Sequence, residues 1–99
     1  MMNPTKQDFS LGDLVATRGV DNLMNQNPSF RNFVQISIRR YFNCDWGDLC
    51  DDDWKQNDEA VRNGERIFAS YYHDASKTKI WIITEWNRSV TTILFPEEY

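Results

Sequence analysis

The sequence is poor in the residues that build the commonest metal, nucleotide and disulfide sites. Its 99 residues include two cysteines, one histidine and four glycines. Cys44 and Cys50 stand six positions apart, which matches no zinc-binding spacing, and two cysteines are too few for a disulfide framework. The glycines are scattered, so no phosphate-binding loop is present. We therefore expect reduced thiols, no bound metal and no cofactor.

Long hydrophobic runs and an excess of positive charge are also missing. The longest apolar stretches, such as residues 80–84 and 93–95, are far shorter than the roughly 18 residues that a membrane-spanning helix needs. The first eight residues contain no apolar segment typical of secretory signals, so a cytoplasmic location is expected. The 15 acidic and 11 basic residues leave a formal net charge of −4. Direct nucleic-acid binding is disfavoured, because it requires a clustered basic surface.

The chain does contain enough apolar side chains for one core. Hydrophobic residues make up 40% of the chain and aromatic residues 14%, including four tryptophans. A large aromatic side chain buries on the order of 150–250 Å², so a few of them can support a domain of this length. Residues 1–10 are polar and show no periodicity. The sequence therefore predicts a flexible N-terminal tail over 1–10 and a single α+β domain over 11–99.

The clearest helix signal follows Asn27-Pro28. Asparagine is a good N-cap, and proline is tolerated at the first helical position. The apolar residues after this pair recur at helical spacing, at Phe30, Phe33, Val34, Ile38 and Tyr41. Upstream, residues 11–18 are consistent with an extra strand or an irregular lead-in, and residues 20–25 predict a short helix.

A second main helix is predicted to begin at Asp45 as its N-cap and to end at Asn63-Gly64. Asp48, three residues later, would lie near the free N–H groups of the first turn. Glycine accepts the left-handed conformation that ends helices. The inner stripe of this helix would comprise Trp46, Leu49, Cys50, Ala60 and Val61.

The pattern then changes from helical to alternating. Residues 66–72, 79–86 and 90–95 are rich in Ile, Val, Thr, Tyr and Trp, which suit a pleated sheet. The middle segment is apolar on both of its faces, so it should be a central strand covered by helices. We predict a three-stranded antiparallel C-terminal sheet packed against the two main helices.

The most unusual local feature is a cluster of acids between residues 45 and 59. A calcium loop starting at Asp51 would need glycine at its sixth position, where Gln56 stands. A carboxylate pair could bind magnesium, but nothing nearby supplies a phosphate cradle. The acids could instead form a solvated face near a helix start, or a protein-binding surface with two tryptophans as apolar anchors. The candidate binding residues are Asp45, Trp46, Asp48, Asp51, Asp52, Asp53, Trp54, Asp58 and Glu59.

No catalytic residue is assigned. His73 is the only histidine, and no nucleophile motif such as G-x-S-x-G surrounds any serine or cysteine. Glu85 stands beside aromatic residues that could raise its pKa, although Arg66 or Arg88 could instead hold it in a structural ion pair. A small enzyme with a pocket near Glu85 and His73 therefore stays open as an alternative.

Several segments resemble a family of short, uncharacterised "plasmid-related" proteins carried by bacterial mobile elements and prophages. The resemblance covers about residues 16–99 and rests on residues 45–49 (DWGDL), 57–60 (NDEA), 79–86 (KIWIITEW), 89–92 (SVTT) and 95–96 (FP). The family implies no activity or catalytic residue. It implies a context, because small acidic proteins of phages and plasmids often inhibit host defence, as anti-CRISPR and anti-restriction proteins do.

The leading hypothesis is a non-enzymatic protein-binding module of a mobile element. Carboxylates on an acidic helix could occupy a basic channel of a host nucleic-acid-processing complex and so block it. A homodimeric regulatory module, formed through an exposed strand edge or an aromatic patch, is the further alternative to an enzyme.

Overall fold

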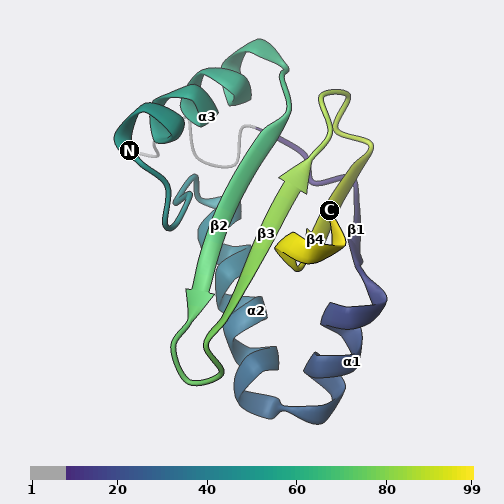
Figure 1. The fold of residues 1–99 in the computed structure, drawn as a ribbon. Helices are drawn as coiled ribbons and strands as arrows, with labels where there is room; N and C mark the ends of the chain where they lie inside the picture. The colour runs from purple at the N-terminus through teal and green to yellow at the C-terminus, as the bar shows by residue number, and fades with distance from the viewer. Residues whose placement is uncertain (1–8) are drawn as a thin grey trace.

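The computed structural model describes residues 9–99 as an α+β fold with a four-stranded mixed sheet (Figure 1). Along the chain the elements are β1 (Asp13–Ala16), α1 (Arg18–Gln26), α2 (Pro28–Phe42), α3 (Asp51–Asn63), β2 (Ile67–His73), β3 (Thr78–Thr84), β4 (Val90–Leu94) and a short 3-10 helix, η1 (Pro96–Glu98). Most of the predicted tail lies outside the described residues. Phe9, near its end, is buried, with its ring centroid 5.7 Å from that of Tyr41.

A side-chain cap begins each of the first two helices, and the cap of α2 is the predicted one. The Thr17 side chain accepts a hydrogen bond from the Val20 N–H at the start of α1. The Asn27 side chain accepts one from the Phe30 N–H at the start of α2, 3.1 Å away, and Pro28 occupies the first helical position. These bonds satisfy N–H groups that have no partner within the helix.

The predicted start of the third helix at Asp45 is wrong, because α3 begins at Asp51. Asp45 instead accepts hydrogen bonds from the Arg40 guanidinium and the Gly47 N–H. Gly47 has a φ of 75°, and a Cβ there would collide with the carbonyl oxygen of Ser70. Residues 46–48 instead bond to Ser70 of β2, with Gly47 in the left-handed conformation. The C-terminal end agrees with the prediction, since Gly64 is left-handed with a φ of 70°.

The sheet order is β1-β4-β3-β2. The three predicted strands pair antiparallel, and Ile82 of β3 lies between Ala69 of β2 and Ile93 of β4. The three-stranded prediction is incomplete, because the N-terminal strand joins the sheet and runs parallel to β4. Parallel strands require a long crossover, which here contains all three α-helices and the β2–β3 hairpin.

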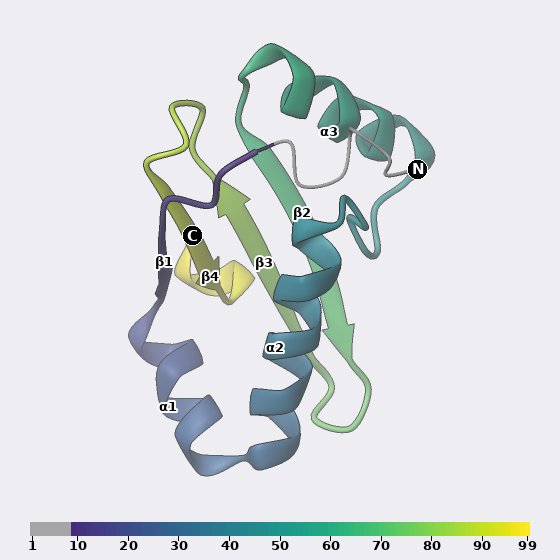
Figure 2. The same cartoon turned by 180° about the vertical axis from the view of Figure 1, so that it is seen from behind.

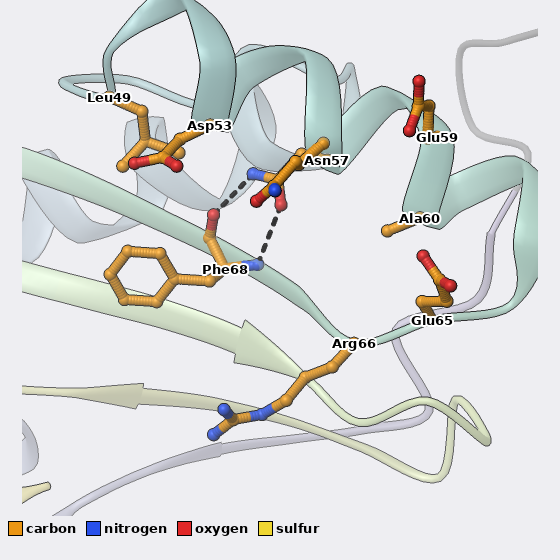
Figure 3. A pocket seen from close by; sticks show the side chains of 9 residues that line it. Leu49, Asp53, Asn57, Glu59, Ala60, Glu65, Arg66 and Phe68 are labelled. Carbon is orange, nitrogen blue, oxygen red and sulfur yellow. Dashed lines mark hydrogen bonds between the residues drawn. The ribbon is translucent and has the colours of Figure 1, made fainter.

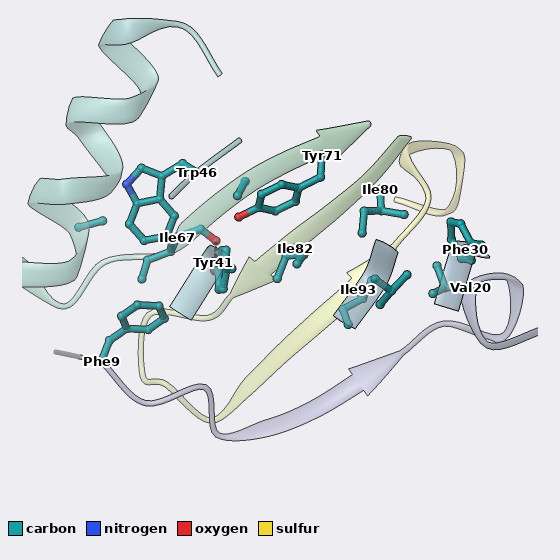
Figure 4. Packing of buried hydrophobic residues seen from close by; sticks show 13 residues of the cluster. Phe9, Val20, Phe30, Tyr41, Trp46, Ile67, Tyr71, Ile80, Ile82 and Ile93 are labelled. Atoms are coloured by element: carbon teal, nitrogen blue, oxygen red, sulfur yellow. Dashed lines mark hydrogen bonds between the residues drawn. The ribbon is translucent and has the colours of Figure 1, made fainter. Parts of the chain in front are cut away.

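The two faces of the sheet are covered differently. α1 and α2 lie on one face, and η1 lies on the other (Figures 1 and 2). The core between the sheet and the helices contains the buried residues of Figure 4, including Phe30, Tyr41 and Ile82. On the opposite face Tyr99 packs edge-on against Trp81, with ring centroids 5.8 Å apart. β3 is therefore covered on both faces, as its apolar sequence predicts.

A chain of hydroxyl groups crosses this core. The Tyr41 hydroxyl lies 2.7 Å from Thr84 Oγ1, which lies 2.7 Å from Thr91 Oγ1. Thr91 donates to the carbonyl oxygen of Leu11 at 2.6 Å, so it accepts from Thr84, which in turn accepts from Tyr41. Burial raises the pKa of Tyr41, which keeps its hydroxyl protonated as the first donor. The network fastens the segment before β1 to the sheet.

Candidate functional site

The candidate site lies where α3 meets the edge of β2. The Asn57 side chain donates to the carbonyl oxygen of Phe68 and accepts from the Phe68 N–H, the latter at 3.3 Å (Figure 3). Further along the edge, Asp48 N–H donates to Ser70 O at 2.7 Å, and Ser70 N–H donates to Trp46 O at 3.4 Å. The helix and the loop before it therefore satisfy backbone groups that an edge strand would otherwise expose.

Arg88 holds the C-terminal end of α3 in place through hydrogen bonds. Its guanidinium donates to the carbonyl oxygens of Ala60, Glu65 and Glu85, at 2.9, 2.6 and 3.2 Å respectively. Carbonyl groups at a helix C-terminus carry partial negative charge, so a cation there is favourable. The β3–β4 turn, the end of α3 and the start of β2 are thereby tied together.

Between α3 and β2 lies a groove of about 450 Å³. Its apolar lining consists of Leu49, Ala60 and Phe68, and its carboxylates are those of Asp53, Glu59 and Glu65. Gln56, Asn57 and Arg66 complete the lining. Figure 3 shows Arg66 directed away from α3, across the sheet. The groove thus combines an apolar surface with three acids.

The groove acids are not neutralised by neighbouring bases. Among residues 9–99 the ion pairs are Arg40–Asp45 and Arg66–Glu85, so Asp53, Glu59 and Glu65 take part in none. Arg66, the base in the lining, lies 3.7 Å from the Glu85 carboxylate and donates to the Tyr99 hydroxyl at 3.1 Å. The groove therefore presents net negative charge to solvent.

Most of the predicted binding residues are accessible, but not all. Asp48, Asp51, Asp52, Asp53 and Glu59 are exposed, and Trp54 is half-buried beside a shallow hollow that it shares with Asp51 and Lys55. Asp58 is partly buried, and its carboxylate accepts from Trp46 Nε1 at 2.9 Å.

Trp46 does not fit the predicted role of apolar anchor. Its side chain is 0% exposed and packs edge-on against Tyr41 in the core, with ring centroids 5.4 Å apart. A residue that is fully buried cannot contact a partner without unfolding its surroundings. Trp46 is a core residue.

Asp45 is likewise held within the molecule. Arg40 donates to both of its carboxylate oxygens, at 2.8 and 3.2 Å. The hydrogen bond from Arg40 lowers the pKa of Asp45, and a bond from the Gly47 backbone N–H lowers it further. Asp45 therefore stabilises the loop before α3.

Of the predicted binding residues, Asp53 and Glu59 line the groove. The prediction missed the other lining residues, which are Leu49, Gln56, Asn57, Ala60, Glu65, Arg66 and Phe68. A helix that ends at Gly64 and is followed directly by a strand implies that the chain turns back beside the helix. This adjacency was the available signal. It does not show which faces meet, because that depends on the Asn57–Phe68 bonds between α3 and β2.

His73 and Glu85 do not share a site. His73 pairs with Thr78 at one end of the β2–β3 hairpin, and its ring stacks on Phe33 with centroids 4.8 Å apart. Glu85 follows the other end of β3 and lies beside Arg66, as one sequence-based alternative held. The ends of β3 are six residue steps apart, so His73 and Glu85 are separated by about 20 Å along the strand. The proposed enzymatic pair is not brought together.

No group of three or more His, Cys, Asp or Glu side chains within residues 9–99 is arranged to hold a metal ion. None of the helices in this range has the length and hydropathy needed to cross a bilayer.

Comparison of the chain with protein-family models, with curated proteins and with solved structures finds no match. The geometry of the groove is therefore the basis for a functional proposal.

Proposed function

We propose that the protein is a non-enzymatic binding module that recognises a basic protein surface through the groove between α3 and β2. The observation that supports this most directly is the grouping of Asp53, Glu59 and Glu65 around an apolar lining, with no ion pair to any of the three within residues 9–99. An interface of this kind gains affinity from buried apolar contact and specificity from complementary charge.

The chemistry of the groove favours lysine or arginine side chains as its occupants. Both residues combine an aliphatic stem with a cationic head, so the stem can pack on Leu49, Ala60 and Phe68 while the head contacts the carboxylates. Phosphate groups would be repelled by the same acids. The exposed acids at the start of α3, Asp51 and Asp52, extend the negative surface beyond the groove.

A narrower role is also part of the proposal. The resemblance to proteins of mobile elements, together with the acidic surface, supports inhibition of a host nucleic-acid-processing complex, such as a CRISPR or restriction complex. Carboxylates on α3 would occupy a basic channel that normally binds phosphates. Trp54 would be the apolar contact at the start of the helix, since Trp46 is buried.

The test is capture of a partner from a bacterial lysate with the wild-type chain and a groove variant. The variant D53N/E59Q/E65Q removes three groove charges, and we expect it to lose the partner. A control variant, D21N/D74N/E97Q, removes three exposed acids outside the groove. Because both variants change the net charge equally, a partner lost only with the groove variant is bound there.

Equal loss with both variants would contradict the proposal, because it would indicate binding through overall charge alone. The captured complex also tests the narrower role. If the α3 carboxylates occupy a channel that binds phosphates, then duplex DNA should displace the protein from its partner. A partner that binds DNA and this protein at the same time would refute the inhibitory role.

A further inference from the structure

The two edges of the sheet differ in whether another segment of the chain bonds to them. The outer edge of β2 is occupied, because Asn57 bonds to Phe68 and the 46–48 segment bonds to Ser70. β1 forms the other edge, and its four side chains are all exposed. Figures 1 and 2 show no other element of the described chain beside this edge. Within residues 9–99, β1 therefore presents an open edge.

The unpaired backbone groups on this edge can be identified from the pairing with β4. Asp13 N–H donates to Ser89 O and Thr17 N–H to Ile93 O, both at 3.0 Å. Successive residues of a strand point their backbone groups to opposite sides. Leu14 and Ala16 therefore direct their N–H and C=O groups away from β4, where no strand of residues 9–99 pairs with them.

The strand lacks most of the features by which proteins protect a free edge. Natural edges often carry lysine, proline or a bulge, or are covered by another segment. Residues 13–16 read DLVA and contain neither lysine nor proline. Leu14 and Val15 are 45% and 43% exposed, so two apolar side chains lie beside the unpaired backbone groups.

The charges flanking the strand select one kind of partner. Asp13 begins β1 and Arg18 follows its end, and neither forms an ion pair within residues 9–99. A second copy running antiparallel would bring each Asp13 close to Arg18 of the partner subunit. A parallel copy would place like charges together. An antiparallel arrangement is also the two-fold symmetric one, which closes as a dimer.

We propose that two copies of this chain associate through their β1 strands, antiparallel, with Val15 opposite Val15 of the partner subunit. Leu14 then exchanges backbone hydrogen bonds with Ala16 of the partner subunit, and the symmetric pair does the same. The two four-stranded sheets become one continuous sheet. The occupied β2 edges lie at its far ends, so both grooves stay accessible.

The dimer is weak and reversible. A strand of four residues buries far less than the roughly 800 Å² per partner of a stable interface. Over protein concentrations from about 10 μM to about 1 mM, dimers are therefore expected only near the upper end. A bivalent partner would bind the two grooves of the dimer with increased avidity.

The test is sedimentation velocity of the full chain over this concentration range, with charge-reversal variants. Wild type should shift from monomer to dimer as concentration rises. Asp13→Arg places like charges together at both ends of the paired strands and should weaken association roughly fivefold. The double variant D13R/R18D restores opposite charges and should recover association.

A second variant tests the backbone pairing. Leu14→Pro removes an N–H that does not bond to β4, and proline is tolerated on edge strands, so the dimer should be lost while the fold remains. If this variant unfolds, the charge-reversal series still decides. Wild type that stays monomeric throughout, or association that the double variant does not recover, would overturn the proposal.

Discussion

At the scale of single residues, the same residue type serves different purposes according to what lies beside it. Asp45 and Asp53 both belong to the acidic cluster seen in the sequence. Asp45 is bound by Arg40 and stabilises a loop, whereas Asp53 lines the groove and forms no ion pair within residues 9–99. Only the folded chain distinguishes a structural carboxylate from one that can contact a partner.

Asp45 should make part of the free energy of unfolding depend on pH in the acidic range. Its pKa is lowered in the folded state by the hydrogen bond from Arg40. The stabilisation is therefore fully present above the ordinary aspartate pKa of about 3.9, and it is lost as the pH falls through the lower folded-state pKa. Because the side chain is 41% exposed, solvent screening keeps the effect small.

The measurement compares the free energy of unfolding of wild type and Asp45→Asn by urea titration between about pH 6 and pH 2. We expect wild type to be more stable at pH 6 and the difference to shrink below about pH 4. Asp48→Asn is the control, because Asp48 is an exposed acid of the same loop whose side chain forms no hydrogen bond or ion pair within residues 9–99. A wild-type advantage that persists unchanged to low pH would contradict this assignment.

At the scale of elements, α3 depends on a few hydrogen bonds for its position. It has no side-chain bond at its N-cap residue, Cys50, and its buried residues are Asn57 and Ala60. Trp54 and Val61 of this helix are only partly buried against the core, so the two bonds between Asn57 and Phe68 contribute a large share of its attachment. The shape of the groove follows from this attachment.

Asn57→Ala should therefore destabilise the protein and loosen α3. The substitution leaves the Phe68 N–H and C=O without partners, which costs about 1–3 kcal/mol. Urea unfolding gives the free-energy change, and amide hydrogen exchange should become faster in α3 than in β3. Gln56→Ala is the control, because this exposed neighbour should change stability by less than about 0.5 kcal/mol. An Asn57→Ala protein with unchanged stability would show that the amide contributes little.

At the scale of the whole molecule, the acidic groove and the β1 edge lie at opposite edges of the sheet. The acids gather on α3 and around the groove, while the apolar β1 edge lies across the sheet. The net charge of −4 is modest, so association with a basic partner should depend on local rather than overall charge.

Salt should therefore weaken partner binding mainly through the association rate. Raising the salt concentration from about 50 mM to about 150 mM shortens the screening length and reduces electrostatic steering. Association and dissociation rates of the captured partner, measured by surface plasmon resonance, should show a slower association rate for wild type and a smaller change for D53N/E59Q/E65Q. A salt response that is identical in the two proteins would place the electrostatic contact outside the groove.

The sequence by itself determined those features that depend on near neighbours along the chain. Asn27-Pro28 predicted the start of α2, Gly64 the end of α3, and the alternating apolar residues the three antiparallel strands, because caps, left-handed glycines and strand periodicity act over a few residues. The apolar faces of β3 also predicted its place in the interior of the sheet.

The tertiary structure alone decided the start of α3, the parallel pairing of β1 and the composition of the groove. Asp45 has the local chemistry of an N-cap, but hydrogen bonds between the 46–48 segment and Ser70, more than 20 residues away, keep these residues out of the helix. Phe68 enters the groove because Asn57 binds its backbone. These outcomes depend on contacts between segments distant in the chain, and local preferences carry no information about which distant segment will be the neighbour.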